Sequence, residues 1–160
     1  MYYAATELKD THTMKPDADA LHYERRARVA RLVNRGQSKL ILALDRELEP
    51  FGVTAAQYAI LSAMRSGRGD TAAQLCKEIS YSPGAMTRML DRLEQKHLIQ
   101  RLPHPDSRRA HKLELTDEGC RTFPEMLAIS SAIIDRFFGD FNSVELRRLE
   151  TLLERMLAHE

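Results

Sequence analysis

One segment of the chain carries threonine and arginine side chains at helical spacing. Thr87, Arg88 and Arg92 fall within a predicted helix, and the two arginines point away from its apolar residues. A guanidinium group can form two parallel hydrogen bonds to a phosphate or to the edge of a guanine. The segment therefore predicts a helix that packs on one side and meets a nucleic-acid partner on the other.

The start of this helix can be read from its capping residues. Ser82 is a good N-cap, and Pro83 suits the first helical position because the amide that proline lacks would be unpaired there. Gly84 falls on the outer side. The apolar stripe at i, i+3, i+4 and i+7 consists of Met86, Met89, Leu90 and Leu93.

A second helix is predicted immediately upstream. Thr71 and Gln74 form a capping box that opens it, and it continues to Ile79. The residues expected on its buried side are Ala72, Leu75, Cys76 and Ile79. Ser80 and Tyr81 leave only a tight turn before the next helix. Two helices joined in this way are typical of a helix-turn-helix, whose second helix enters the DNA major groove.

The periodicity changes from helix to strand after His97. We expect Leu98, Gln100 and Leu102 on one side of a first strand. In the next strand, Leu113 and Leu115 alternate with polar residues. Residues 103–107 (Pro-His-Pro-Asp-Ser) form the tip of the predicted hairpin, or wing.

In these segments the chain resembles the MarR family of winged helix-turn-helix transcription regulators. The matching residues lie in 54–61 (TAAQYAIL), 82–94 (SPGAMTRMLDRLE), 98–101 (LIQR), 108–110 (RRA) and 115–119 (LTDEG). The resemblance implies a homodimer whose N- and C-terminal helices interlock and which binds a pseudo-palindromic double-stranded DNA operator. It further implies a repressor that is released by a small aromatic or phenolic acid, bound between the dimerisation helices and the DNA-reading lobe.

The resemblance also assigns the wing. The family's wing usually reads D-R-R-A, whereas Ser107 stands here in the aspartate position and Asp106 comes one residue earlier. Arg109 matches the arginine that enters the minor groove. The full set of predicted DNA-binding residues is Ser82, Pro83, Gly84, Thr87, Arg88, Arg92, His104, Ser107, Arg108 and Arg109.

Charge supports the same segment independently of the resemblance. The chain has 24 basic and 23 acidic residues, which is close to neutral. Residues 80–112 hold seven of the basic and three of the acidic residues, a net charge of +4. We therefore expect the positive potential to be confined to this segment.

The predicted fold is mainly α (α+β): a winged helix-turn-helix with a two-stranded wing and N- and C-terminal dimerisation helices. A long helical pattern from Leu21 to Leu48 is interrupted by Gly36, and Thr54, Thr116 and Ser143 open further helices. The predicted organisation is a flexible extension over 1–18, a DNA-binding domain over 53–116, and a helical dimerisation region over 19–52 and 117–160.

The last helix carries an apolar seam at 3-4-3 spacing. Its members are Leu146, Leu149, Leu153 and Met156. This seam is wider than a terminal helix buries on its own globule, and packing inside the chain is one explanation for it. Because the resemblance implies that the terminal helices of two subunits interlock, and because symmetric DNA sites are read by twofold dimers, we expect a dimer interface here instead.

An acidic effector needs basic side chains or a hydrogen-bond donor near the junction of the dimerisation helices and the DNA-reading lobe. The candidates are His22, Arg26, Arg31, Arg35, Tyr58 and Arg65. Two alternatives stay open: a redox-sensing repressor acting through Cys120 at a helix start, and a DNA-binding protein without an effector.

The pattern of residues argues against other classes of protein. The chain shows no motif of a nucleophile with its base, no glycine-rich phosphate loop and no closely spaced metal ligands. We therefore expect no enzyme activity, no cofactor and no metal. No apolar run approaches the ~20 residues that span a membrane, and the N-terminus lacks the features of a signal peptide, so we expect a cytoplasmic protein that does not engage membranes.

Overall fold

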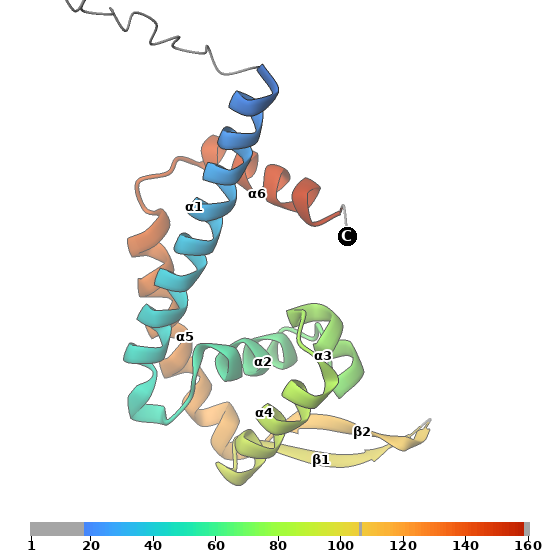
Figure 1. The fold of residues 1–160 in the computed structure, drawn as a ribbon. Helices are drawn as coiled ribbons and strands as arrows, with labels where there is room; N and C mark the ends of the chain where they lie inside the picture. The colour runs from blue at the N-terminus through green and yellow to red at the C-terminus, as the bar shows by residue number, and fades with distance from the viewer. Residues whose placement is uncertain (1–17, 106, 159–160) are drawn as a thin grey trace, which may run out of the picture. The chain divides into compact units, whose positions relative to one another are not determined.

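The computed structural model describes residues 18–105 and 107–158 of the chain. The predicted flexible extension over 1–18 therefore lies almost wholly outside the described residues, and so does Asp106 at the wing tip. The elements are α1 (Ala18–Glu47), η1 (Glu49–Phe51), α2 (Ala55–Arg65), α3 (Ala72–Ile79), α4 (Pro83–Gln95), β1 (Ile99–His104), β2 (Ser107–Leu115), α5 (Asp117–Phe138) and α6 (Ser143–Leu157) (Figure 1). The predicted mainly helical α+β architecture is confirmed.

The helices begin where capping residues were predicted. Thr54 and Thr71 each form a complete capping box, and Ser82 accepts a hydrogen bond from the amide of Ala85. Thr116 accepts one from Gly119. At the last helix the cap is one residue earlier than expected. Asn142 accepts from the amides of Val144 and Glu145, and its capping box is completed by the Glu145 side chain.

The long first helix is continuous through Gly36, so the predicted interruption is wrong. A Cβ added at Gly36 would meet nothing within 4 Å in the described structure. Among the described residues, those up to Gln37 form one compact unit, and those from Ser38 onward form another. The functional boundaries expected at 52/53 and 116/117 stay a prediction.

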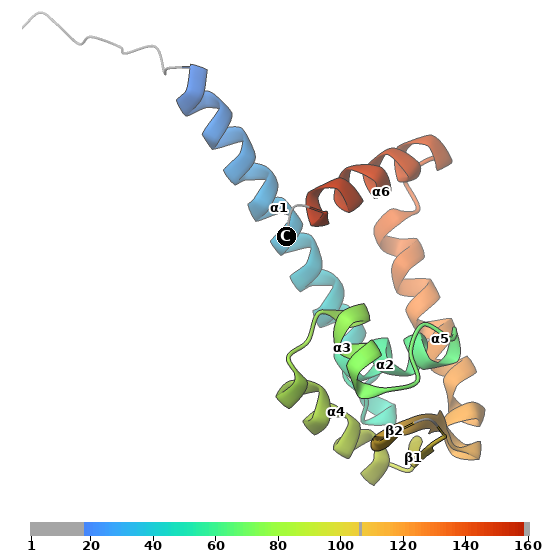
Figure 2. The same ribbon diagram turned by 90° about the vertical axis from the view of Figure 1, so that its right-hand side faces the viewer.

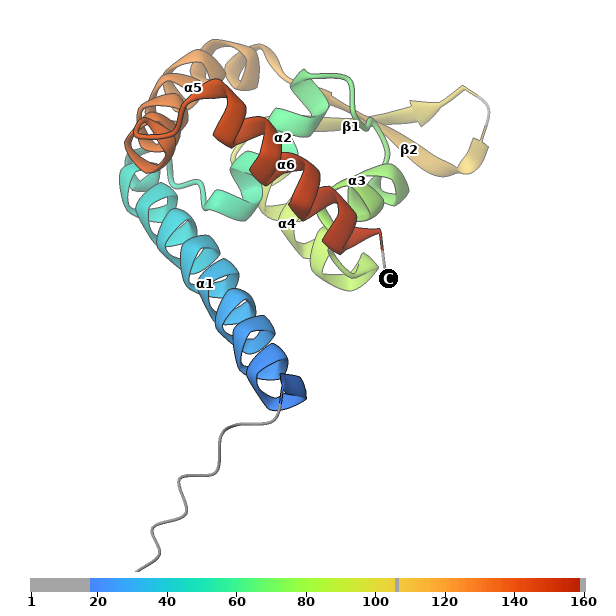
Figure 3. The ribbon, with the colours of Figure 1, turned by 90° about the horizontal axis from the view of Figure 1, so that it is seen from above.

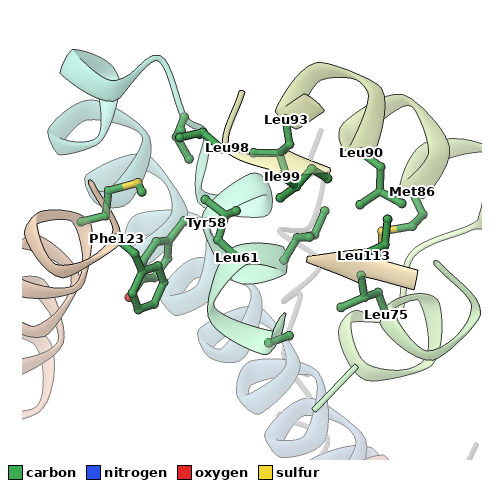
Figure 4. Packing of buried hydrophobic residues seen from close by; sticks show 14 of the residues in the cluster. Tyr58, Leu61, Leu75, Met86, Leu90, Leu93, Leu98, Ile99, Leu113 and Phe123 are labelled. Atoms are coloured by element: carbon green, nitrogen blue, oxygen red, sulfur yellow. The ribbon is translucent and has the colours of Figure 1, made fainter. Parts of the chain in front are cut away.

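The hydrophobic core of the second unit joins α2, α3, α4, the hairpin and α5. Leu75, Met86, Leu90 and Leu93 are at most 2% exposed (Figure 4). With Met89, which is partly buried and packs against the same core, they confirm the predicted inner stripe of α4 and the central residue of α3. Ala72 was expected to be buried as well, but it is exposed because it lies in the first turn of α3, at the edge of the core.

The structure decides which face of β1 is buried, which the alternation along the predicted strand had left open. Ile99 is buried and pairs with Leu115, whereas Gln100 is exposed and pairs with Glu114. Leu98 is also buried, but it lies in the turn before β1. Within the strand, Gln100 is exposed and Leu102 is half-buried. The two strands run antiparallel, and the hairpin that they form extends away from the helices (Figure 3).

The wing is joined to α5 through the backbone. Thr116 donates its amide to the carbonyl of Leu98 at 3.2 Å and its hydroxyl to the carbonyl of His97 at 2.5 Å. Gly119 lies against the same carbonyl, since an added Cβ would come within 2.1 Å of the Leu98 oxygen. No described helix is long and apolar enough to cross a membrane.

We expect Gly119→Ala to lower the free energy of unfolding by about 1 to 3 kcal/mol, the usual cost of overpacking. The new methyl group can be accommodated only if the start of α5 moves away from a backbone carbonyl. Gly84→Ala is the matched control, because Gly84 also lies in the first turn of a helix and its Cβ would make an ordinary 3.7 Å contact with Arg88. Urea titration of the two variants compares them directly. Equal stability would contradict the close approach at Gly119.

Candidate nucleic-acid interface

Helix α4 presents two chemically different faces. Met86, Leu90 and Leu93 are buried against the core, whereas Thr87, Arg88 and Arg92 are exposed. The hydroxyl of Thr87 donates to the Pro83 carbonyl at 2.9 Å. The structure thus brings the predicted basic residues of α4 together on its outer side.

The turn before α4 is tight, as expected from its length. Ser80 adopts a left-handed conformation, with φ of 56°. The amides of Ser80 and Tyr81 both donate to the carbonyl of Cys76. These two hydrogen bonds close α3 at its C-terminal end. Because Ser82 caps α4, only Ser80 and Tyr81 lie between the end of α3 and that cap. The two helices pack against each other (Figure 2).

The structure separates the basic residues of the 80–112 segment by their partners. Arg101 forms ion pairs with Asp91 at 2.6 Å and with Glu94 at 2.8 Å. Lys112 pairs with Glu114 at 2.8 Å, and this hydrogen bond and charge raise the pKa of Lys112. Among the described residues, Arg88 and Arg92 have no carboxylate partner. These two guanidinium groups are therefore available to an external anion.

Lys96 has a different role at the end of α4. Its ammonium group donates to the carbonyl of Gly52 and to Gln57 Oε1, the latter at 3.1 Å. Desolvation lowers the pKa of Lys96, and the neighbouring charge of Arg92 lowers it further. Gln57 Oε1 also accepts from the Thr54 amide in the α2 capping box. Lys96 thus fastens the end of α4 to the start of α2.

The predicted wing residues are placed by their backbone. His104 is half-buried at the end of β1 and pairs with Ser107, the first residue of β2. Arg108 and Arg109 follow in β2, but their side chains lie outside what the structure describes. Which of the two points toward a groove stays a prediction.

The effector candidates occupy two helices. His22, Arg26, Arg31 and Arg35 are exposed on α1. On α2, Arg65 is exposed, but Tyr58 is buried and its ring stacks on Phe123 with centroids 6.0 Å apart.

A groove of about 470 Å³ lies between α3, α4 and β2, and none of the six candidates lines it. Its lining residues are Thr71, Ala72, Ala73, Thr87, Leu90, Arg101, Ala110, His111 and Leu113.

The predicted seam of α6 is apolar and open. Leu146 and Met156 are 38% and 46% exposed, Leu149 and Leu153 are half-buried, and α6 has no buried residue.

The two cysteines differ in their surroundings, since Cys76 packs against the core whereas Cys120 is exposed. Over the described residues, no cluster of three side chains is suited to hold a metal ion.

Two features were missed by reasoning from the sequence. Arg101 was counted only among the seven basic residues of 80–112, although acids at Asp91 and Glu94, one turn apart on the preceding helix, could have indicated its partners. The positive charge is also not confined to residues 80–112, so that expectation is wrong. Residues 21–40 of α1 hold six basic residues against Glu24, namely Arg25, Arg26, Arg28, Arg31, Arg35 and Lys39.

The chain is similar to known proteins over most of its length. Residues 51–110 match the model of the MarR family. The multiple antibiotic resistance protein MarR of Escherichia coli is 32% identical over 133 residues, covering 81% of this chain and 89% of that protein. The transcriptional repressor MdtR of Bacillus subtilis is 31% identical over 129 residues, covering 81% of each.

A solved structure agrees with these relatives. It is a crystal structure of a cysteine-to-serine mutant of MarR from E. coli complexed with operator DNA. It superposes with a TM-score of 0.75 and 29% identity, covering 84% of this chain and 97% of the other. The relatives are transcriptional regulators rather than enzymes, which agrees with the absence of an enzyme motif. By sequence identity over most of both chains and by its winged-helix structure, this protein belongs to the MarR family.

Proposed function

We propose that the protein is a homodimeric transcriptional repressor that binds a pseudo-palindromic operator with α4 in the major groove. The observation that carries this proposal is the outer face of α4, where Arg88 and Arg92 are exposed and have no carboxylate partner among the described residues. Such groups contact phosphates and base edges. The solved structure with 29% identity was crystallised in complex with operator DNA, which supports binding of an operator by this chain.

Selection of bound sequences from a random DNA library tests this proposal. A symmetric dimer should enrich a pseudo-palindrome whose half-sites lie about one helical turn, ~10 bp, apart. Affinity should fall steeply with salt, because phosphate contacts release counterions. Enrichment of no sequence, with binding that is equal for all duplexes, would refute a sequence-specific regulator.

The wing makes a separate prediction. If Arg109 enters the minor groove, it senses the negative potential of narrow A·T-rich tracts rather than individual bases. Arg109→Ala should then weaken binding to many sequences alike and lower the salt slope by about one phosphate equivalent. Arg108→Ala is the matched control, measured over the same salt series. A larger loss at 108 than at 109 would mean that Ser107 and Asp106 hold the wing in another register.

We further propose that a small aromatic acid releases the protein from DNA. For this, the acid must favour a state that binds DNA poorly, since equal affinity for both states shifts nothing. The groove between α3, α4 and β2 suits such a ligand. It combines apolar Leu90 and Leu113 with the polar side chains of Thr71, Thr87 and His111. The alternative location for the acid is at the predicted effector-binding residues on α1 and α2.

Thermal unfolding with a series of benzoic acids tests release and location together. A true effector raises the unfolding temperature by mass action and weakens operator binding. Ala73→Leu narrows the groove from the exposed start of α3. Loss of the thermal shift in this variant supports the groove, whereas an unchanged shift points to α1 and α2. If no acid acts but oxidation abolishes DNA binding unless Cys120 is replaced by serine, the redox alternative is correct.

A further inference from the structure

Arg101 connects the wing to the recognition helix through two carboxylates. One guanidinium nitrogen lies 2.6 Å from Asp91 Oδ1 and the other lies 2.8 Å from Glu94 Oε2. The Arg101 side chain is 27% exposed, whereas the two carboxylates are 44% and 40% exposed. The forked guanidinium therefore spans two acids that lie one turn apart on α4.

The position of Arg101 is fixed from the side of the hairpin. It pairs with Leu113 across the sheet, and Leu113 is 4% exposed. The amide of Leu113 donates to the carbonyl of Asp70 at 2.7 Å, which ties this point of the hairpin to the segment before α3. Ile99, two residues before Arg101, is buried in the core. The cation thus sits at the anchored base of the wing rather than on its tip.

The two acids matter because of where they lie on α4. Asp91 comes three residues after Arg88, a spacing at which oppositely charged side chains pair on a helix. Asp91 also precedes Arg92 directly in the sequence. If Asp91 and Glu94 lacked a partner, they would place negative charge beside the face that meets phosphates, and Asp91 would compete with DNA for Arg88. In the structure, both carboxylates bind Arg101 instead.

We propose that Arg101 is a positioning residue for DNA binding, which keeps Arg88 and Arg92 available by holding Asp91 and Glu94. The inference rests on the proposed function, because it assumes that α4 meets DNA. Arg101 contributes without touching the operator. Ion pairs that are this exposed contribute little to folding stability, so the effect falls on DNA affinity rather than on the fold.

Replacing Arg101 by methionine tests the inference in the full-length protein. Arg101→Met should weaken operator binding about tenfold, the scale of losing a phosphate contact, with the thermal unfolding midpoint and the dimer little changed. Lys112→Met is the matched control. It removes a cation of the same hairpin whose acidic partner, Glu114, lies on β2 and not on α4. It should lose less affinity than Arg101→Met.

Compensation separates a positioning role from a structural one. Adding Asp91→Asn and Glu94→Gln to Arg101→Met removes the unpaired acids and should restore most of the lost affinity, although the ion pairs stay broken. The inference is overturned if the triple variant binds as weakly as Arg101→Met, or if Arg101→Met binds like the wild type. In the same titrations, wild-type protein that fails to bind operator, or binding that survives Arg88→Ala, would instead refute the proposed function.

Discussion

Arg88→Ala is expected to weaken operator binding by about 1 to 3 kcal/mol, or roughly five- to 150-fold, the value of a bidentate contact to a guanine. Arg88 is exposed in the second turn of α4 and has no carboxylate partner among the described residues. Its loss should also relax discrimination at particular base pairs, because a base contact reads sequence whereas a phosphate contact does not. Titration of the native operator and of single-base variants measures both effects.

The Arg88 variant should remain folded, because the side chain packs against nothing in the core. Arg136→Ala is a suitable control, since Arg136 is also exposed and lies far along the sequence in the last turn of α5. It removes the same charge from the chain without changing α4. Unchanged operator affinity and unchanged base discrimination in Arg88→Ala would show that α4 is not the recognition helix.

Leu153→Asp is expected to convert the dimer to monomers. Leu153 lies half-buried in the middle of the α6 seam, and the helix it belongs to has no buried residue in the described chain. A second copy packed on this seam would bury the new carboxylate without a partner, which costs about 3 to 5 kcal/mol. Since a monomer loses the second half-site, operator affinity should fall with dimerisation.

Sedimentation velocity at several protein concentrations measures this change. Thr151→Asp is the control, because residue 151 lies on the opposite side of α6 from the seam and its hydroxyl donates only to the Arg147 carbonyl in the same helix. It introduces the same charge and should leave the dimer intact. A Leu153→Asp protein that sediments as a dimer would show that the seam packs elsewhere.

Local chemistry explains why so much was predictable from the sequence. The starts of α2, α3, α4 and α5 were predicted correctly because a cap is completed by residues within three positions of one another. The inner stripe of α4 was predictable because helical periodicity needs no knowledge of the partner. The same applies to the exposed basic face that carries Arg88 and Arg92, and to the order of elements that defines the winged helix.

Properties that depend on distant segments were decided by the tertiary structure. The alternation of residues in β1 left open which of its two faces is buried. The face that carries Ile99 is the buried one, because Ile99 pairs with Leu115 across the sheet and Arg101 pairs with Leu113. Close approach at Gly119 depends on a carbonyl 21 positions earlier in the chain, at Leu98. Net charge predicted a positive segment, but only folding pairs Arg101 with the two acids of α4. The sequence by itself determined the helix caps and the basic face, because those depend on neighbours; the structure determined which charges are neutralised, because pairing depends on proximity in space.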